Sequence, residues 1–190
     1  MDREEFFLSM SIVDRQVNLS WEVIIVYVPA DHSRSVDFLA ELKNEVERYT
    51  TPVVVARDFN LIQQADDKSS MTLDRGRMRM FNDCIADLAL WELAYIGARF
   101  TWTNKQMDHI RSVVDRVLVS MQWEVMFPLC SLRAVTWIGA DHVAVLLSSG
   151  DDAPPKPRWF HFKPAWLMQP RFMALVCNRS VEAVASPPHA

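Results

Sequence analysis

The pattern of apolar and polar positions divides the chain into short strands and a few helices with one apolar face. Residues 6–13 and 21–28 are two apolar runs, separated by a polar stretch and closed by Pro29, and this arrangement predicts a β-hairpin. Between residues 35 and 49, apolar residues recur every three or four positions. That period predicts an amphipathic helix, which leads into a predicted buried strand at residues 53–56.

The second half of the chain continues this alternation of strand and helix patterns. Residues 66–70 are polar and predict a solvated loop. Asp74 follows at a position suited to cap a helix. The expected apolar face of that helix consists of Met78, Phe81, Ile85 and Leu88. Further strands are predicted at 100–103, 113–119, 132–137 and 143–147, with a short helical turn at 123–127. The pattern therefore predicts a mixed α/β protein.

Composition and charge narrow the class of protein. The chain has 190 residues, of which 50% are hydrophobic and 23% charged, and these values suit one globular domain. Its net charge of -4 shows no basic surplus, so binding to nucleic acid would need a local cationic patch. Arg75, Arg77 and Arg79 offer some positive charge, either as a solvated face or as contacts to phosphate.

The cysteines and the N-terminal residues bear on the compartment. Cys84, Cys130 and Cys177 lie far apart and are odd in number, so they predict neither a disulfide framework nor a zinc knuckle. A reducing, intracellular compartment, nuclear or cytoplasmic, is the simpler expectation. The first five residues are too acidic for a signal peptide, and the longest apolar run, 23–30, is too short to span a bilayer. No membrane role is predicted.

Two polar residues follow directly after the buried strand at 53–56. Because side chains two positions apart point the same way in an extended chain, Asp58 and Asn60 are expected to emerge together. The carboxyl ends of strands are where open α/β sheets carry their chemistry. The alternative is a strand that runs into an ordinary turn, where Asp and Asn are common.

Four other residues also stand out within or beside predicted strands. Asp115 lies on an otherwise apolar strand face, where its carboxylate needs a partner. That partner is either Arg116 with a neighbouring strand or a side chain that Asp115 orients. The pair Asp141 and His142 precedes a strand, which suggests coordination or proton transfer. Tyr27 ends the second strand and either covers the edge of the core or donates to a phosphate.

In order and spacing, these motifs resemble the endonuclease/exonuclease/phosphatase family. The resemblance runs from about residue 21 to 147 and rests on residues 27–29, 58–60, 100–102, 114–120 and 140–142. Intervening segments resemble the endonuclease domain of plant LINE-type (non-LTR) retrotransposons; they are residues 61–62, 67–68, 77–78, 81–82, 92–93, 123 and 127–128.

The resemblance implies a four-layer α/β sandwich of the DNase I-like type and metal-assisted hydrolysis of a phosphoester in DNA, usually with Mg²⁺. It implies that Asp58 orients or deprotonates the attacking water and that Asn60 fixes this geometry. His142 would donate to the phosphate while Asp115 holds its ring. Tyr27 would donate to a phosphate oxygen, and Asp141 would support either the metal or the adjacent hydrogen-bond network. Such sites act mainly by positioning and charge neutralisation.

Departures from the family pattern weaken the expected metal site. If the resemblance holds, the chain is expected to start after the strands that carry the family's Asn and metal-binding Glu, and Mg²⁺ normally needs one or two carboxylates plus phosphates. Arg57 stands where the family usually has Gly, and Ala140 where it usually has Ser. The sequence therefore predicts a truncated, degenerate endonuclease domain of retrotransposon origin. The alternatives are an active Mg-dependent phosphodiesterase and a non-enzymatic interaction module.

The predicted domain organisation has three parts. Residues 1–150 form the partial domain, 151–158 a Pro-rich linker, and 159–190 a partly helical tail that resembles the connector toward the reverse transcriptase in such elements. Loss of the first strands is expected to leave a sheet edge unpaired and apolar strands uncovered. Marginal stability and self-association through that edge are the predicted consequences.

Overall fold

The computed structural model describes residues 6–28, 32–107, 109–135 and 140–150. These residues all belong to one unit of the chain, Met1–Asp151. The predicted linker and tail, and Trp137 at the end of a predicted strand, lie outside the described residues. Among the described residues, no helix is long and apolar enough to cross a membrane.

A five-stranded sheet organises the fold, in the order β1-β2-β3-β8-β4. Strands β1 (Phe7–Asp14) and β2 (Leu19–Tyr27) pair antiparallel, which confirms the predicted hairpin. Strand β3 (Val53–Asp58) runs parallel to β2, and β8 (Asp115–Ser120) runs antiparallel to β3. Strand β4 (Leu90–Glu92) completes the sheet beside β8.

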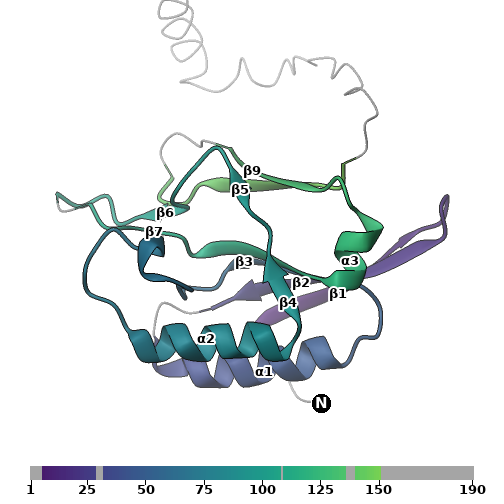
Figure 1. Cartoon of the computed structure of the whole chain (residues 1–190), viewed down its shortest axis with the longest axis horizontal. Coiled ribbons are helices and arrows are strands. Elements are labelled where there is room, and N and C mark those ends of the chain that lie inside the picture. Colours follow the sequence, from purple (N-terminus) through teal and green to yellow (C-terminus); the bar gives the residue numbers. More distant parts are fainter. Residues whose placement is uncertain (1–5, 29–31, 108, 136–139, 151–190) are drawn as a thin grey trace, which may run out of the picture. The chain divides into compact units, whose positions relative to one another are not determined.

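Two helices cover one face of this sheet, as Figure 1 shows. They are α1 (Ser35–Glu47) and α2 (Arg75–Asp87), preceded by the 3-10 turns η1 (His32–Arg34) and η2 (Ala65–Asp67). The Asp74 carboxylate accepts from the Arg77 backbone N–H at 3.0 Å, so the predicted helix cap is confirmed. Phe38, Phe59 and Phe81 are fully buried in the core between helices and sheet.

A second, three-stranded sheet packs on the other face. Its order is β10-β9-β5, with β10 Ala144–Ser148, β9 Ser131–Val135 and β5 Tyr95–Ile96. A second apolar core lies here, formed by Val54, Leu93, Val117, Val119, Trp123 and Leu132. Helix α3 (Met121–Met126) borders it, and β6 (Trp102–Thr103) pairs with β7 (Arg111–Ser112) in a separate hairpin. Helices and two sheets thus form successive layers.

The structure corrects two sequence expectations about exposure. Asp67 is 5% exposed rather than solvated, because its carboxylate accepts from the Gln63 backbone N–H and pairs with Arg116. The strand at 53–56 is also not left uncovered, since Val53 to Val55 are at most 3% exposed. Strand β1 occupies the sheet edge instead. Its Leu8 and Val13 are more than 60% exposed, so self-association through this edge stays a prediction.

Candidate active site

Three neighbouring strands bring polar residues to one end of the five-stranded sheet, where β2 and β3 finish and β8 begins. In the register of the sheet, Asp58 at the end of β3 lies between Tyr27 of β2 and Asp115 of β8. Because side chains alternate along a strand, Asp58 and Asp115 share the face of Val54 and Val117, toward the second sheet. The alternation of the sequence therefore places both carboxylates between the two sheets.

His142 reaches this end of the sheet from the segment that precedes β10. Its Nδ1 lies 2.8 Å from Asp115 Oδ2, so the expected contact between these residues is confirmed. Asp115 is thus paired with the ring and not with Arg116, which binds other acids. The opposite ring nitrogen, Nε2, lies 4.0 Å from Asp58 Oδ2. A carboxylate at Nδ1 selects the tautomer and stabilises the imidazolium, so Nε2 is positioned for proton transfer.

The Asp58 carboxylate is held by the turn that follows it. The Asn60 backbone N–H donates to Asp58 Oδ1 at 2.8 Å, and Asn60 Nδ2 donates to the Val28 carbonyl at 2.7 Å. Burial raises the pKa of Asp58 and the Asp115 charge adds to this, while the Asn60 N–H, His142 and Arg57 act in the opposite direction. Asp58 therefore accepts a proton more readily than an exposed aspartate.

This raised pKa leads to a prediction on stability. The folded protein binds a proton at Asp58 more tightly than the unfolded chain does, so ionised Asp58 lowers stability at pH values above its folded pKa. We expect Asp58→Asn to raise the denaturation midpoint at neutral pH. The gain should vanish as the pH falls and wild-type Asp58 becomes protonated. Urea unfolding at several pH values checks this, and a pH-independent difference between the two proteins would contradict it.

Thr101 is a positioning residue that sequence reasoning did not single out beyond its place in a motif. Its buried Oγ1 accepts the backbone N–H groups of Val114 and Asp115, each at 3.0 Å. Its carbonyl accepts the Val143 N–H at 2.7 Å. Thr101 therefore holds the backbone of Asp115 and the backbone of Val143, the residue that follows His142. The signal for it in the sequence was its place between Phe100 and Trp102 in a motif that carries the family resemblance.

A cavity of about 680 Å³ opens between the two sheets at this site. Its polar end is lined by Tyr27, Arg57, Asp58, Asp115 and His142, and the rest mainly by Ile25, Ala56, Val117, Val143, Val145 and Leu147. Tyr27 is 63% exposed, so its hydroxyl is accessible. The volume falls within the range of about 300–1,000 Å³ typical of small-ligand sites.

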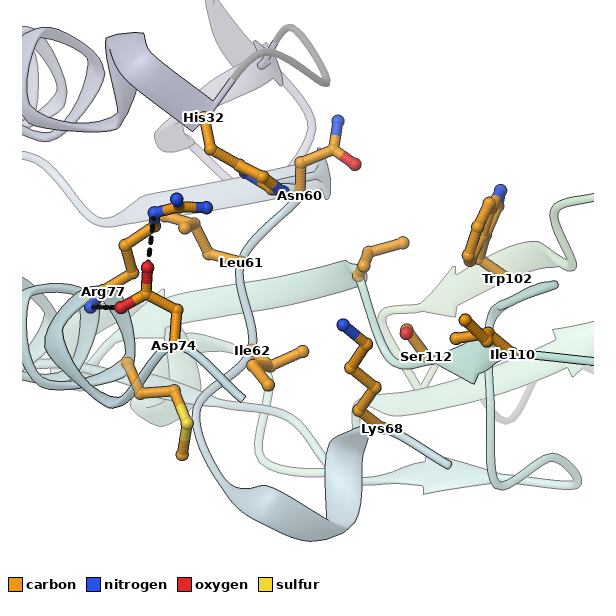
Figure 2. A pocket seen from close by; sticks show the side chains of 12 residues that line it. His32, Asn60, Leu61, Ile62, Lys68, Asp74, Arg77, Trp102, Ile110 and Ser112 are labelled. Atoms are coloured by element: carbon orange, nitrogen blue, oxygen red, sulfur yellow. Dashed lines mark hydrogen bonds and ion pairs between the residues drawn. The ribbon is translucent and has the colours of Figure 1, made fainter. Parts of the chain in front are cut away.

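A second cavity of about 330 Å³ lies on the other side of Asn60 and is shown in Figure 2. Lys68 extends toward its middle, between the Asp74–Arg77 pair and Trp102. Arg77 is thus the one residue of the predicted basic cluster that lines this pocket, since Arg75 and Arg79 do not. Cationic and aromatic groups here are suited to contact nucleic acid beside the Asp58 site.

The residues at the site do not form a complete metal centre. No group of three or more His, Cys, Asp or Glu side chains in the described part of the chain could hold a metal ion. Ala140 and His142 line the large cavity, but the exposed Asp141 does not. The metal role expected for Asp141 stays a prediction, and Mg²⁺ does not fit the residues described.

Comparisons of structure identify the fold. No protein-family model matches the sequence, and no curated protein matches it significantly. The structure is similar to the endonuclease domain of TRAS1, a telomere-specific non-LTR retrotransposon, with a TM-score of 0.60, 17% identity, 75% of this chain covered and 62% of that chain. It is similar to the AP endonuclease LMAP from Leishmania major, with a TM-score of 0.58, 10% identity and coverages of 74% and 53%.

A third similar structure is the 3′ phosphatase NExo from Neisseria bound to product DNA hairpin, with a TM-score of 0.52, 18% identity and coverages of 67% and 60%. The chain therefore has the DNase I-like fold of endonuclease/exonuclease/phosphatase proteins, which confirms the expected fold class. It spans between 53% and 62% of the length of these three structures.

Proposed function

We propose that this chain is a degenerate phosphodiester hydrolase domain of retrotransposon origin, which acts on DNA slowly. The observation that carries the proposal is the contact of Asp115 with His142 at 2.8 Å, with the far ring nitrogen facing Asp58 at 4.0 Å. A carboxylate, an oriented imidazole and a second acid in one cavity are the groups that acid–base hydrolysis of a phosphoester requires.

In this proposal each residue has one role. Asp58 orients the attacking water and accepts its proton, which its raised pKa favours. His142 donates from Nε2 to the phosphate as negative charge develops, and Asp115 holds the ring. Asn60 fixes Asp58 through its backbone N–H. Tyr27 donates to a phosphate oxygen from the mouth of the cavity.

The retrotransposon origin and the DNA substrate are supported by separate observations. One similar structure is a retrotransposon endonuclease domain, and another is bound to DNA. Because the net charge of -4 gives no general attraction to DNA, contact must come from local cations. Lys68 and Arg77 in the second cavity supply such charge next to Asn60. The plant affiliation rests on the sequence resemblance alone.

The incomplete set of metal ligands is the reason to expect slow hydrolysis. Nicking of supercoiled plasmid in Mg²⁺ should be detectable only at high protein concentration. We expect Asp58→Ala and His142→Ala each to reduce this rate by about 10²-fold or more, because positioned acid–base groups contribute about 10²–10⁴-fold. The initial rate of conversion to nicked plasmid measures the effect.

Asp66→Ala and His109→Ala are matched controls, since both residues are exposed and lie outside the two cavities. Both controls should keep the wild-type rate. Equal rates in all five proteins would mean that a contaminating nuclease acts, and would remove support for the site. Rapid turnover by the wild type would instead refute its degeneracy and favour an active phosphodiesterase.

A further inference from the structure

Arg57 adopts a backbone conformation that argues for a ligand. Its φ is +111°, in the left-handed region that favours glycine and strains a long side chain. Such outliers persist where the surrounding structure holds them, and they cluster at binding sites. Strands β2 and β8 flank Arg57, which pairs with Val26 on one side and Arg116 on the other.

The positive φ takes the Arg57 side chain alone out of the alternation of β3, since Ala56 and Asp58 both still line the cavity between the two sheets. Val53 and Val55 point into the core on the helix side of the sheet. Strict alternation would send the side chain of Arg57 into the same core, where an unpaired charge would be costly. Arg57 is instead exposed and lines the large cavity. The strained backbone therefore delivers a cation to the polar end of that cavity.

The N–H groups of the Arg57 guanidinium are available to bind a ligand. Its Cζ lies 5.9 Å from the centroid of the Tyr27 ring, a cation–π contact that uses none of its N–H groups. No hydrogen bond or ion pair joins the Arg57 side chain to another residue in the described part of the chain. The cation faces the same cavity as Asp58, Asp115 and His142.

We propose that Arg57 and Tyr27 form an anion clamp that binds the oxygens of a phosphate group in front of His142. The Arg fork matches phosphate oxygens bidentately. A tetrahedral phosphate presents oxygens in several directions, so one group can meet Arg57 and His142 together, which a planar carboxylate does less well. The clamp places positive charge where the described residues lack a full set of metal ligands. It rests on the proposed phosphoester site.

Binding of phosphate without turnover tests the clamp. The probes are inorganic phosphate and a single-stranded DNA hexamer, titrated by NMR in EDTA, with acetate as a planar control anion. We expect Arg57→Gln to weaken binding of both phosphate probes by about tenfold or more, as loss of a charge-assisted bidentate contact does. The affinity of Arg57→Lys should lie between those of the wild type and Arg57→Gln, because lysine keeps the charge but cannot make the bidentate contact.

Arg99→Gln is the matched control. Arg99 is exposed and stacks on Phe100 with its Cζ 5.2 Å from the ring centroid, but it does not line the cavity. It removes the same unit of charge and should change affinity less than about threefold, as expected for a distant charge that salt screens. Equal losses in both Gln variants, or no phosphate binding by the wild type, would overturn the clamp.

Arg57→Gly separates ligand binding from a structural role. Because glycine tolerates the left-handed backbone, this variant should raise the melting temperature by roughly 2–6 °C while it weakens phosphate binding. A higher melting temperature with unchanged affinity would refute the clamp. The titrations run in EDTA and therefore measure binding alone. An absence of plasmid nicking in the separate Mg²⁺ assay would count against the proposed function and would not change the result of these titrations.

Discussion

Replacing Arg116 by methionine is expected to lower the free energy of unfolding by about 3–5 kcal/mol, the usual cost of removing one partner from a buried ion pair. Arg116 is 2% exposed, and its guanidinium contacts Asp67 Oδ2 and Glu92 Oε2, each at 2.5 Å. It also donates to the Val113 carbonyl at 3.0 Å. Without Arg116 two largely buried carboxylates face each other with no cation between them.

The dependence on pH distinguishes lost charge pairing from lost packing. Burial raises the pKa of Glu92, and Arg116 opposes that rise. Once Arg116 is removed, protonation of Glu92 relieves part of the penalty. The difference in unfolding free energy between the wild type and Arg116→Met should therefore shrink as the pH falls. Urea unfolding at each pH measures this difference. A deficit that is constant with pH would mean that packing dominates.

Lys43→Met provides a matched surface control. Lys43 pairs with Asp87 at 2.9 Å, but the two side chains are 42% and 60% exposed. Exposed pairs are screened by solvent and contribute little to stability. The control should unfold at nearly the wild-type denaturant concentration. If both substitutions had the same effect, the buried network around Arg116 would not be a main source of stability.

Local pattern was sufficient to predict the hairpin and the two long helices, but not the short strands β4 and β5. The β-branched run at 53–55 predicted a buried strand, which β3 confirms. An acid on the apolar face of β8 predicted a partner for Asp115, which is His142. These features follow from the period of a single strand, which the sequence contains in full. Asn60 was expected to emerge together with Asp58, but the two side chains line different cavities, because the chain turns at Asn60, whose φ is +49°.

Contacts between segments far apart in the chain could not be predicted from the local pattern of residues. Asp67 appeared to belong to a solvated loop, because nothing in a polar run indicates that Arg116, 49 residues later, will bury it. The strand expected to begin at Val113 begins at Asp115, since the Val113 N–H bonds to the Asp67 carbonyl instead of a strand. The bonds of Thr101 also depend on tertiary arrangement.

Phe59 is expected to link the core to the site, and Phe59→Ala should cost about 3–5 kcal/mol of unfolding free energy. Its ring is fully buried, with centroids 6.2 Å from Phe38 and 5.4 Å from Phe81. Phe59 lies between Asp58 and Asn60 in the sequence, so its anchorage on the helix side fixes the turn that holds the Asp58 carboxylate. Chemical denaturation measures the loss, with the fully exposed Met107→Ala as a neutral control.

Phe59→Leu tests this link in a protein that still folds, because leucine retains much of the buried volume. Hydrogen exchange of the Asn60 amide, which donates to Asp58 Oδ1, reports on the turn. We expect exchange at Asn60 to accelerate more than exchange at Met10 in β1, which pairs with Val23 far from the site. Equal acceleration at both amides would show that Phe59 stabilises the domain as a whole without a specific hold on the site.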